Sequence, residues 1–229
     1  MPDGTPQPIK ALVTAGPTEE PIDEVRFVGN RSSGRMGIAI AEALAARGVA
    51  VTLALGPVRV PLPGARFCTE GAAPIEVVRF RTAADLEELM RARLGEFDLV
   101  VMAAAVADYR PRVAAAGKLR RTAETLALEL EPVPDLLAAT HAMRRSGARV
   151  VGFALEPAER LESSALDKLA RKDLWGIVAN PLETMESPDI AGTLFTRAGR
   201  RLPPAPRMPK GEFARWLAAE ITGEAAEQG

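Results

Sequence analysis

The chain has 229 residues, 47% of them hydrophobic, so we expect one domain with a substantial core over residues 9–222 and frayed tails at 1–8 and 223–229. Its 29 basic and 30 acidic residues nearly cancel, which argues against a protein that binds nucleic acid through a broad basic surface. One cysteine excludes an intramolecular disulfide, and we identify neither a signal peptide nor an apolar run long enough to span a bilayer, so we expect a cytoplasmic protein without a membrane partner.

Two single residues limit the possible chemistry. His141, the one histidine, stands among helical apolar residues in "LLAATHAMRRSG" with no cysteine nearby, so a zinc site or a Ser-His-Asp triad would lack parts. Cys68 has no neighbouring base in "GARFCTEG". We therefore expect His141 to be a helix surface or packing residue and Cys68 to be an ordinary loop or strand thiol.

Short apolar segments, largely β-branched, predict strands that are buried on both faces. In chain order they are residues 9–16, 49–56, 75–80, 97–106, 148–155 and 174–180. Helical stretches alternate with them at residues 35–47, 83–94, 134–145 and 161–172. This alternation predicts the α/β class, with a Rossmann-like open, mostly parallel sheet and helices on both faces.

Three further segments depart from that alternation. Residues 124–132 alternate apolar and polar side chains, and residues 192–202 form two short runs around an Ala-Gly turn, so both predict antiparallel additions. In "KGEFARWLAAEITGEA", residues 210–225, the apolar side chains Phe213 and Leu217 begin a four-residue repeat. This repeat predicts a closing amphipathic helix.

A long loop, residues 17–34, follows the first predicted strand, and ligands of open parallel sheets bind at the carboxyl ends of strands. The loop leads into "VGNRSSGRMG", which suggests a glycine-rich phosphate loop. In a dinucleotide fingerprint Ser32 would replace the first glycine, and in a P-loop Arg35 and Met36 would stand where a lysine and a hydroxyl residue are required. Both named motifs therefore fail.

The same stretch still has the features of an anion site. Residues 32–34 can cap the following helix while its free N–H groups and the positive end of its dipole face the strand ends. A capped helix start with solvated arginines explains these residues equally well. Asn30 favours the ligand site, because its amide can orient a carbonyl or phosphate oxygen. The anion-binding candidates are Arg31, Ser32, Ser33, Gly34 and Arg35.

The segment "VTAGPTEEPIDEVRFVGNRSSGRMG" strongly resembles the signature of the phosphopantothenoylcysteine synthetase domain of bacterial coenzyme A biosynthesis, which is commonly fused behind a flavin-dependent decarboxylase. Five later segments resemble that family's later motifs in the same order: "AAAVADYRP", "KLRR", "VPDLLA", "VGFALE" and "KLARKDLWGIVAN". The resemblance spans residues 9–181. Several segments in order are more specific than any single glycine pattern.

The resemblance implies a ligase. In that family 4′-phosphopantothenate and CTP give an acyl-cytidylate and pyrophosphate, and the amine of cysteine then releases CMP and phosphopantothenoylcysteine. Bacterial members use CTP and Mg²⁺ and work as dimers, so the resemblance implies these substrates, Mg²⁺ bound mainly through the triphosphate, and a homodimer. Because no decarboxylase segment precedes the synthetase motifs, we expect no flavin in this chain, and a stand-alone synthetase or one cut from a fusion.

The resemblance also implies roles for single residues. Asn30 matches an asparagine that handles the acyl-cytidylate, and Lys118 matches the lysine of a mobile flap over the substrates, with Gly117 as a possible hinge. A plain mobile loop would have the same sequence character. The nucleotide-binding candidates are Gly16, Ala104, Asp108, Phe153, Lys168 and Lys172.

Three of these candidates have other interpretations when only their spacing is considered. Lys168 and Lys172, four residues apart on a predicted helix, could bind a triphosphate together or form a solvated helix flank. Asp108, directly after a buried strand, could bind a base, a sugar or a metal ion, or could cap a turn. The resemblance favours the triphosphate for the two lysines.

The chain departs from the family's pattern near the expected site. Arg31 stands where a histidine is frequent, and arginines replace lysines at 35, 120 and 121, which keeps the charge but changes the donor geometry. Val133 replaces an asparagine and Pro181 an aspartate. Two other functions therefore stay open: an NAD(P)- or flavin-dependent oxidoreductase on the same fold, and a nucleotide-sensing module without turnover. The sequence does not decide between CTP and ATP.

Overall fold

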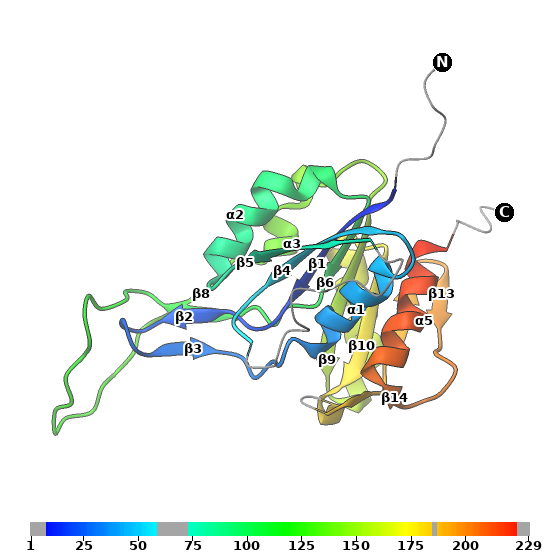
Figure 1. Cartoon of the computed structure of the whole chain (residues 1–229). Helices are drawn as coiled ribbons and strands as arrows, with labels where there is room; N and C mark the ends of the chain where they lie inside the picture. The colour runs from blue at the N-terminus through cyan, green and yellow to red at the C-terminus, as the bar shows by residue number, and fades with distance from the viewer. Residues whose placement is uncertain (1–7, 59–72, 185–186, 224–229) are drawn as a thin grey trace, which may run out of the picture.

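The computed structural model describes residues 8–58, 73–184 and 187–223. Its centre is an eight-stranded sheet with the strand order β13-β12-β10-β9-β6-β1-β4-β5 (Figure 1). The strands from β10 to β5 in that order are parallel, and β12 and β13 join one edge antiparallel. This confirms the predicted open, mostly parallel Rossmann-like sheet. The strands are β1 (Lys10–Ala15), β4 (Ala50–Leu55), β5 (Ile75–Arg79), β6 (Leu99–Met102), β9 (Arg149–Glu156), β10 (Gly176–Pro181), β12 (Thr193–Thr196) and β13 (Gly199–Arg201).

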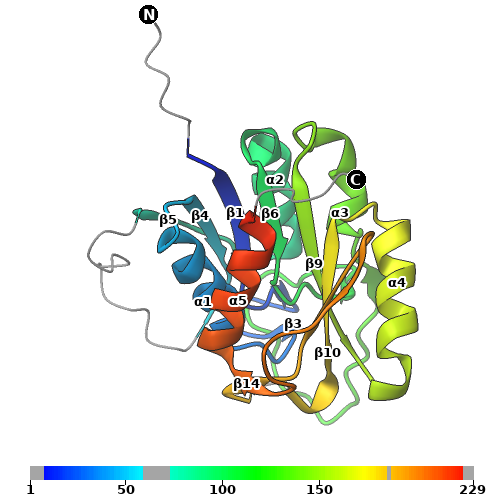
Figure 2. The ribbon, with the colours of Figure 1, turned by 90° about the vertical axis from the view of Figure 1, so that its right-hand side faces the viewer.

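Helices cover both faces of the sheet, with α1 and α5 on one face and α2, α3 and α4 on the other (Figure 2). Within β1, Val13 packs into the core beneath α1 and α5, whereas Leu12 packs into the core beneath α2. Neighbouring residues of one strand thus enter different cores, which explains why the strand is apolar at nearly every position. The helices are α1 (Arg35–Ala45), α2 (Ala83–Arg93), α3 (Leu136–Ala139), α4 (Leu161–Arg171) and α5 (Lys210–Thr222).

The strand order reverses beside β1. The chain runs from β1 through β4 to β5 at one edge, then returns to β6 on the other side of β1 and continues through β9 to β10. Ligands of open α/β sheets bind where the order reverses, beyond the carboxyl ends of the strands. The topology therefore places the expected site between the segments that follow β1 and β6.

Two hairpins project from this end of the sheet, at the left of Figure 1, and we term them, with the loop of the second, the arm (residues 19–29 and 109–132). Buried Asp23, in the turn of the first hairpin, accepts hydrogen bonds from the N–H groups of Arg26 and Leu119. These bonds hold the long loop of the second hairpin against the first. The hairpin strands are β2 (Glu19–Pro21), β3 (Phe27–Gly29), β7 (Tyr109–Pro111) and β8 (Leu130–Pro132).

The helix predicted over residues 134–145 is wrong. The chain forms only the short α3 and a 3-10 turn, η2 (His141–Met143). The Arg144 guanidinium donates to the carbonyl of Leu137, which a continuing helix would pair with the N–H of His141. The same guanidinium also donates to the carbonyl of Asp173, so a tertiary contact ends the helix early.

The other departures from the simple alternation are largely as predicted. The hairpin expected over 192–202 is confirmed by β12 and β13, and the closing helix is confirmed by α5. Within 124–132 only β8 is a strand, and it pairs with β7 rather than with the central sheet. The strand expected over 97–106 is shorter, because β6 ends at Met102.

The remaining predictions concern single residues and the chain ends. His141 lies at the surface, as expected, and its ring pairs with Asp173. Cys68 and the tail residues 1–7 and 224–229 lie outside the described residues. Within the described ranges, no helix has both the length and the apolar character that a bilayer crossing requires. The short elements not named so far are η1 (Leu94–Glu96), η3 (Ala158–Arg160), η4 (Leu182–Thr184), β11 (Asp189–Ile190) and β14 (Met208–Pro209).

Candidate functional site

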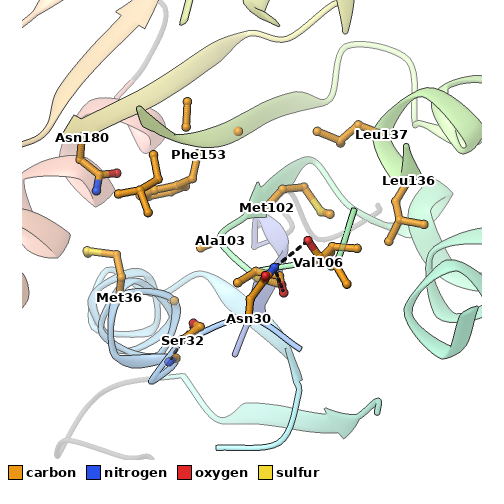
Figure 3. Close-up of a pocket in the computed structure, with 18 of the residues that line it drawn as sticks. Asn30, Ser32, Met36, Met102, Ala103, Val106, Leu136, Leu137, Phe153 and Asn180 are labelled. Carbon is orange, nitrogen blue, oxygen red and sulfur yellow. Dashed lines mark hydrogen bonds between the residues drawn. The ribbon is translucent and has the colours of Figure 1, made fainter. Parts of the chain in front are cut away.

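A cavity of about 820 Å³ opens at the carboxyl ends of the central strands (Figure 3). Its wall comes from the segment leading into α1, the loop after β6, the loop before α3, and β9. The volume is within the range of sites that bind small organic molecules and cofactors. All predicted site residues except Gly16 and Lys118 line it, namely Asn30, Arg31, Ser32, Ser33, Gly34, Arg35, Ala104, Asp108, Phe153, Lys168 and Lys172.

Asn30 follows β3 and connects two walls of the cavity. Its amide nitrogen donates to the carbonyl oxygens of Ala105, at 3.3 Å, and Val106, at 3.0 Å (Figure 3). The side chain is therefore held against the loop after β6 by its N–H groups. Among the described residues nothing donates to its amide oxygen, which leaves that acceptor for a ligand.

The start of α1 has the character of an anion site. Gly34 is the N-cap residue, with a left-handed φ of 72°, and as a glycine it has no side chain to cap the helix. The Ser32 and Ser33 hydroxyls instead accept long hydrogen bonds of 3.4 and 3.5 Å from the N–H groups two residues on. The N–H groups of the first turn and the positive end of the helix dipole therefore stay available to an anion in the cavity.

Gly16 lies behind the cavity rather than in its wall. Its carbonyl accepts the N–H of Ala105 at 2.9 Å. A Cβ atom on Gly34 would come within 3.3 Å of the Gly16 backbone, and Gly16 itself has a φ of 84°. Gly16 thus supports the cavity through Gly34 and Ala105, in positions that glycine permits.

Two buried threonines of the first strand and its extension hold the loop after β6. The Thr14 hydroxyl accepts the N–H of Ala104 at 3.1 Å, and the Thr18 hydroxyl accepts the N–H of Ala107 at 3.0 Å. Neither threonine was among the predicted site residues. The signal was present in Thr14, a hydroxyl in an otherwise apolar buried strand, because buried polar groups need a partner.

Asp108 is exposed at the end of this loop. Its backbone carbonyl accepts the N–H of Val133 at 2.9 Å, but its carboxylate makes no hydrogen bond with any described residue. The turn-cap interpretation is therefore not observed, and the carboxylate is available to a ligand. Val133, which replaces the family's asparagine, lines the cavity with an apolar side chain at the same place.

Lys168 and Lys172 face the cavity together, and each is paired with a carboxylate. The Lys168 amine lies 2.5 Å from Glu156 at the end of β9, and the Lys172 amine lies 2.9 Å from Asp135 before α3. The hydrogen bond from Lys168 lowers the pKa of Glu156. Burial opposes ionisation of Asp135, but Lys172 and two backbone N–H groups hold its pKa below the usual value. The pKa shifts favour the carboxylate forms of Glu156 and Asp135, so each lysine has a negative charge beside it.

Lys118 lies on the exposed arm, outside the cavity wall. The N–H of Gly117 donates to the Glu24 carboxylate, and the N–H of Leu119 donates to Asp23. The structure therefore does not bring Lys118 together with the other predicted site residues.

Comparison with known proteins supports the assignment made from the motifs. The profile of the family described as "DNA/pantothenate metabolism flavoprotein C-terminal domain" matches residues 7–224. The chain is 40% identical over 174 residues to a cysteine/cysteine sulfinic acid decarboxylase of an unknown prokaryotic organism, covering 76% of this chain and 46% of that protein. It is 36% identical over 206 residues to the coenzyme A biosynthesis bifunctional protein CoaBC of Escherichia coli K12, covering 87% of this chain and 48% of that protein.

The chain thus spans about half the length of the curated relatives it matches. A crystal structure of the C-terminal domain of coenzyme A biosynthesis bifunctional protein CoaBC matches the fold with a TM-score of 0.74 and 32% identity, covering 93% of both chains. The chain belongs to the DNA/pantothenate metabolism flavoprotein C-terminal domain family, as its ordered motifs predict.

Proposed function

We propose that the chain is a phosphopantothenate–cysteine ligase, which joins 4′-phosphopantothenate to cysteine in coenzyme A biosynthesis. One observation carries the proposal: motif segments that are far apart in the sequence surround one cavity at the strand ends. Membership of the family and 36% identity to a bifunctional coenzyme A biosynthesis protein support the same function.

The two steps of the proposed reaction need positive groups, and the wall of the cavity contains them. A carboxylate oxygen of phosphopantothenate attacks the α-phosphorus of the nucleotide, and the bond to the β-phosphate breaks to release pyrophosphate. The amine of cysteine then attacks the acyl carbon, loses a proton and displaces the nucleoside monophosphate. The first step brings two anions together, so it needs positive groups and alignment rather than a covalent nucleophile. The start of α1, with Arg31 and Arg35, supplies positive groups.

We propose CTP as the nucleotide and Mg²⁺ as part of that substrate. Mg²⁺ keeps several waters and binds through one or two carboxylates plus substrate phosphates. Asp108 fits this pattern as a carboxylate in the cavity wall without a protein partner in the described part of the chain. Among the described residues no cluster of three or more metal-binding side chains is present, which fits an ion held mainly by the triphosphate.

We further propose that the segment around Lys118 closes over the cavity when substrates bind. Gly117 has a left-handed φ of 74°, and a Cβ atom there would meet nothing within 4 Å. Closure must break or carry along the hydrogen bonds to Asp23 and Glu24, so the energy of ligand contact would drive it. We propose no flavin for this chain.

The purified protein is expected to release pyrophosphate and CMP when given 4′-phosphopantothenate, CTP, Mg²⁺ and cysteine, because both steps need only these reactants. A panel of nucleoside triphosphates in the same assay identifies the preferred base. Absence of pyrophosphate with every nucleotide would overturn the ligase proposal. Binding without turnover would then favour a nucleotide-sensing module, and oxidation or reduction of a nicotinamide or flavin would favour an oxidoreductase.

The homodimer is proposed to form through the arm. Large apolar side chains are exposed along it, in contrast to the usual surface of a monomer. Leu126 and Leu128, before β8, and Leu130, at its start, are all exposed. The exposed apolar residues of the arm are Val25, Phe27, Tyr109, Val113, Leu126, Leu128 and Leu130.

Replacing Leu126 with aspartate is expected to weaken dimerisation about tenfold or more, because burial of a leucine contributes roughly 1.5–3 kcal/mol and a buried carboxylate is unfavourable. Sedimentation velocity over a concentration series measures the dissociation constant. Leu202→Asp is the matched control, since Leu202 is 60% exposed and Leu126 is 61% exposed, but Leu202 lies away from the arm. A monomeric wild-type chain, or equal effects of the two variants, would contradict the arm as the interface.

A further inference from the structure

The cations around the cavity fall into two groups. Lys168 and Lys172 each have a carboxylate within 3 Å. Arg31, Arg35 and Lys210 also line the cavity, and none of these three forms an ion pair within 4.0 Å with any described residue. Lys210, the first residue of α5, was not among the predicted site residues.

Helix packing brings Lys210 to the cavity. α1 and α5 lie side by side on one face of the sheet and start at the same end, the lower one in Figure 2. A 2.8 Å hydrogen bond joins their C-terminal ends, from the Arg47 guanidinium just after α1 to the hydroxyl of Thr222, the last residue of α5. The N–H of Lys210 donates to the carbonyl of Pro188 at 3.0 Å, which fixes the backbone where α5 begins. Arg35 and Lys210 are therefore equivalent first residues of two parallel helices.

This corner of the cavity is electrostatically unfavourable without an anion. Partial burial and the nearby Arg35 charge lower the pKa of Lys210, and Asp189 opposes the shift only in part. A cation at the first residue of a helix also faces the positive end of the helix dipole, where an acidic side chain is the stabilising choice. The first turn of α1 has no acidic residue, and the one acidic residue in the first turn of α5, Glu212, is exposed and does not line the cavity.

We propose that Lys210 is a further substrate-binding residue, which together with Arg35 binds the β- and γ-phosphates of the nucleoside triphosphate. This inference rests on the proposed ligase function. The terminal phosphates carry most of the charge of the nucleotide and leave together as pyrophosphate, so they suit the cations whose charge is not compensated. Lys168 and Lys172, already neutralised by Glu156 and Asp135, suit the less charged part of the nucleotide.

If Lys210 binds the β- and γ-phosphates, its loss should affect the affinity for CTP but not the affinity for CMP, which lacks them. Lys210→Gln is expected to weaken CTP binding by roughly 10- to 100-fold, the range for loss of a hydrogen bond to a charged group, and to leave CMP binding within about twofold of wild type. Lys210→Arg should retain most of the CTP affinity because it keeps the charge. Isothermal titration calorimetry with each nucleotide measures both effects. Lys10→Gln, at the opposite end of the sheet, is the matched control.

Inorganic tripolyphosphate distinguishes failure of this inference from failure of the ligase proposal. If wild type binds tripolyphosphate and Lys210→Gln binds it at least tenfold more weakly, the anion site stands even when no pyrophosphate is released from any nucleotide. If Lys210→Gln binds CTP and tripolyphosphate as wild type does, the inference is overturned although the ligase function stands. Equal weakening of CTP and CMP, or a melting temperature well below that of Lys10→Gln, would assign Lys210 a structural role instead.

Discussion

Asn30→Asp is expected to lower kcat for pyrophosphate release about 100-fold or more, with a much smaller change in CTP affinity. The asparagine amide donates to the carbonyl oxygens of Ala105 and Val106. A carboxylate cannot donate to these oxygens and repels them, and it adds a negative charge beside a carboxylate and an α-phosphate that already repel each other. Single-turnover kinetics with saturating CTP measures the effect, and mass spectrometry shows whether the acyl-cytidylate accumulates.

Asn30→Ala separates the two contributions, because it removes the hydrogen bonds without adding charge. If both variants lose activity equally, Asn30 acts by holding the loop after β6. Thr18→Val, which removes another support of this loop by leaving the N–H of Ala107 without its partner, should then show a related loss. A much larger loss in Asn30→Asp than in Asn30→Ala places the side chain against the reacting anions. Turnover of Asn30→Asp at the wild-type rate would contradict both roles.

The central sheet was predictable because its strands are buried on both faces, and burial leaves a continuous apolar signal in each segment. Three strands of the arm gave no such signal. β2, β3 and β7 have only three residues each, and a three-residue strand is too short to establish a period, whereas β8 ends an alternating segment, residues 124–132, that could be selected. The helix expected over residues 134–145 is short for a different reason. The Arg144 guanidinium donates to the carbonyl of Leu137, which a longer helix would pair with a backbone N–H, and it also donates to the carbonyl of Asp173.

Some residues of the site could likewise be predicted from the sequence, and others could not. Asp108, which follows a predicted strand, could be selected because the topology places strand ends together. Asn30 could be selected from its amide and from the motif around it, in the loop after the first predicted strand. Lys210 could not, because its position depends on how α5 packs beside α1 rather than on the end of a parallel strand. The ion pairs of Lys168 with Glu156 and of Lys172 with Asp135 could not be predicted from the sequence either, because the carboxylates lie outside the helix that carries Lys168.

Gly37, in α1, belongs to the glycine-rich segment that suggested a phosphate loop, and its packing role can be tested by a stability measurement. Gly37→Ala is expected to destabilise the protein by about 1–3 kcal/mol, although alanine is the better helix former by roughly 1 kcal/mol. A Cβ atom at this position would lie 2.6 Å from the Ala15 side chain and 2.8 Å from the Thr14 carbonyl oxygen. α1 would have to move away from β1. Chemical denaturation monitored by circular dichroism measures the change.

Gly211→Ala is the matched control, because it is also a glycine in a helix, but a Cβ atom there would meet only the Arg215 guanidinium, at 3.9 Å. This variant should keep or raise the stability by up to about 1 kcal/mol. A stable Gly37→Ala would show that α1 can shift on the sheet at little cost. In the expected case the loss extends to the site, because the displaced α1 carries Arg35, which lines the cavity, so CTP affinity should fall together with stability. The glycine at this position then serves the phosphate site by fixing the helix that presents it.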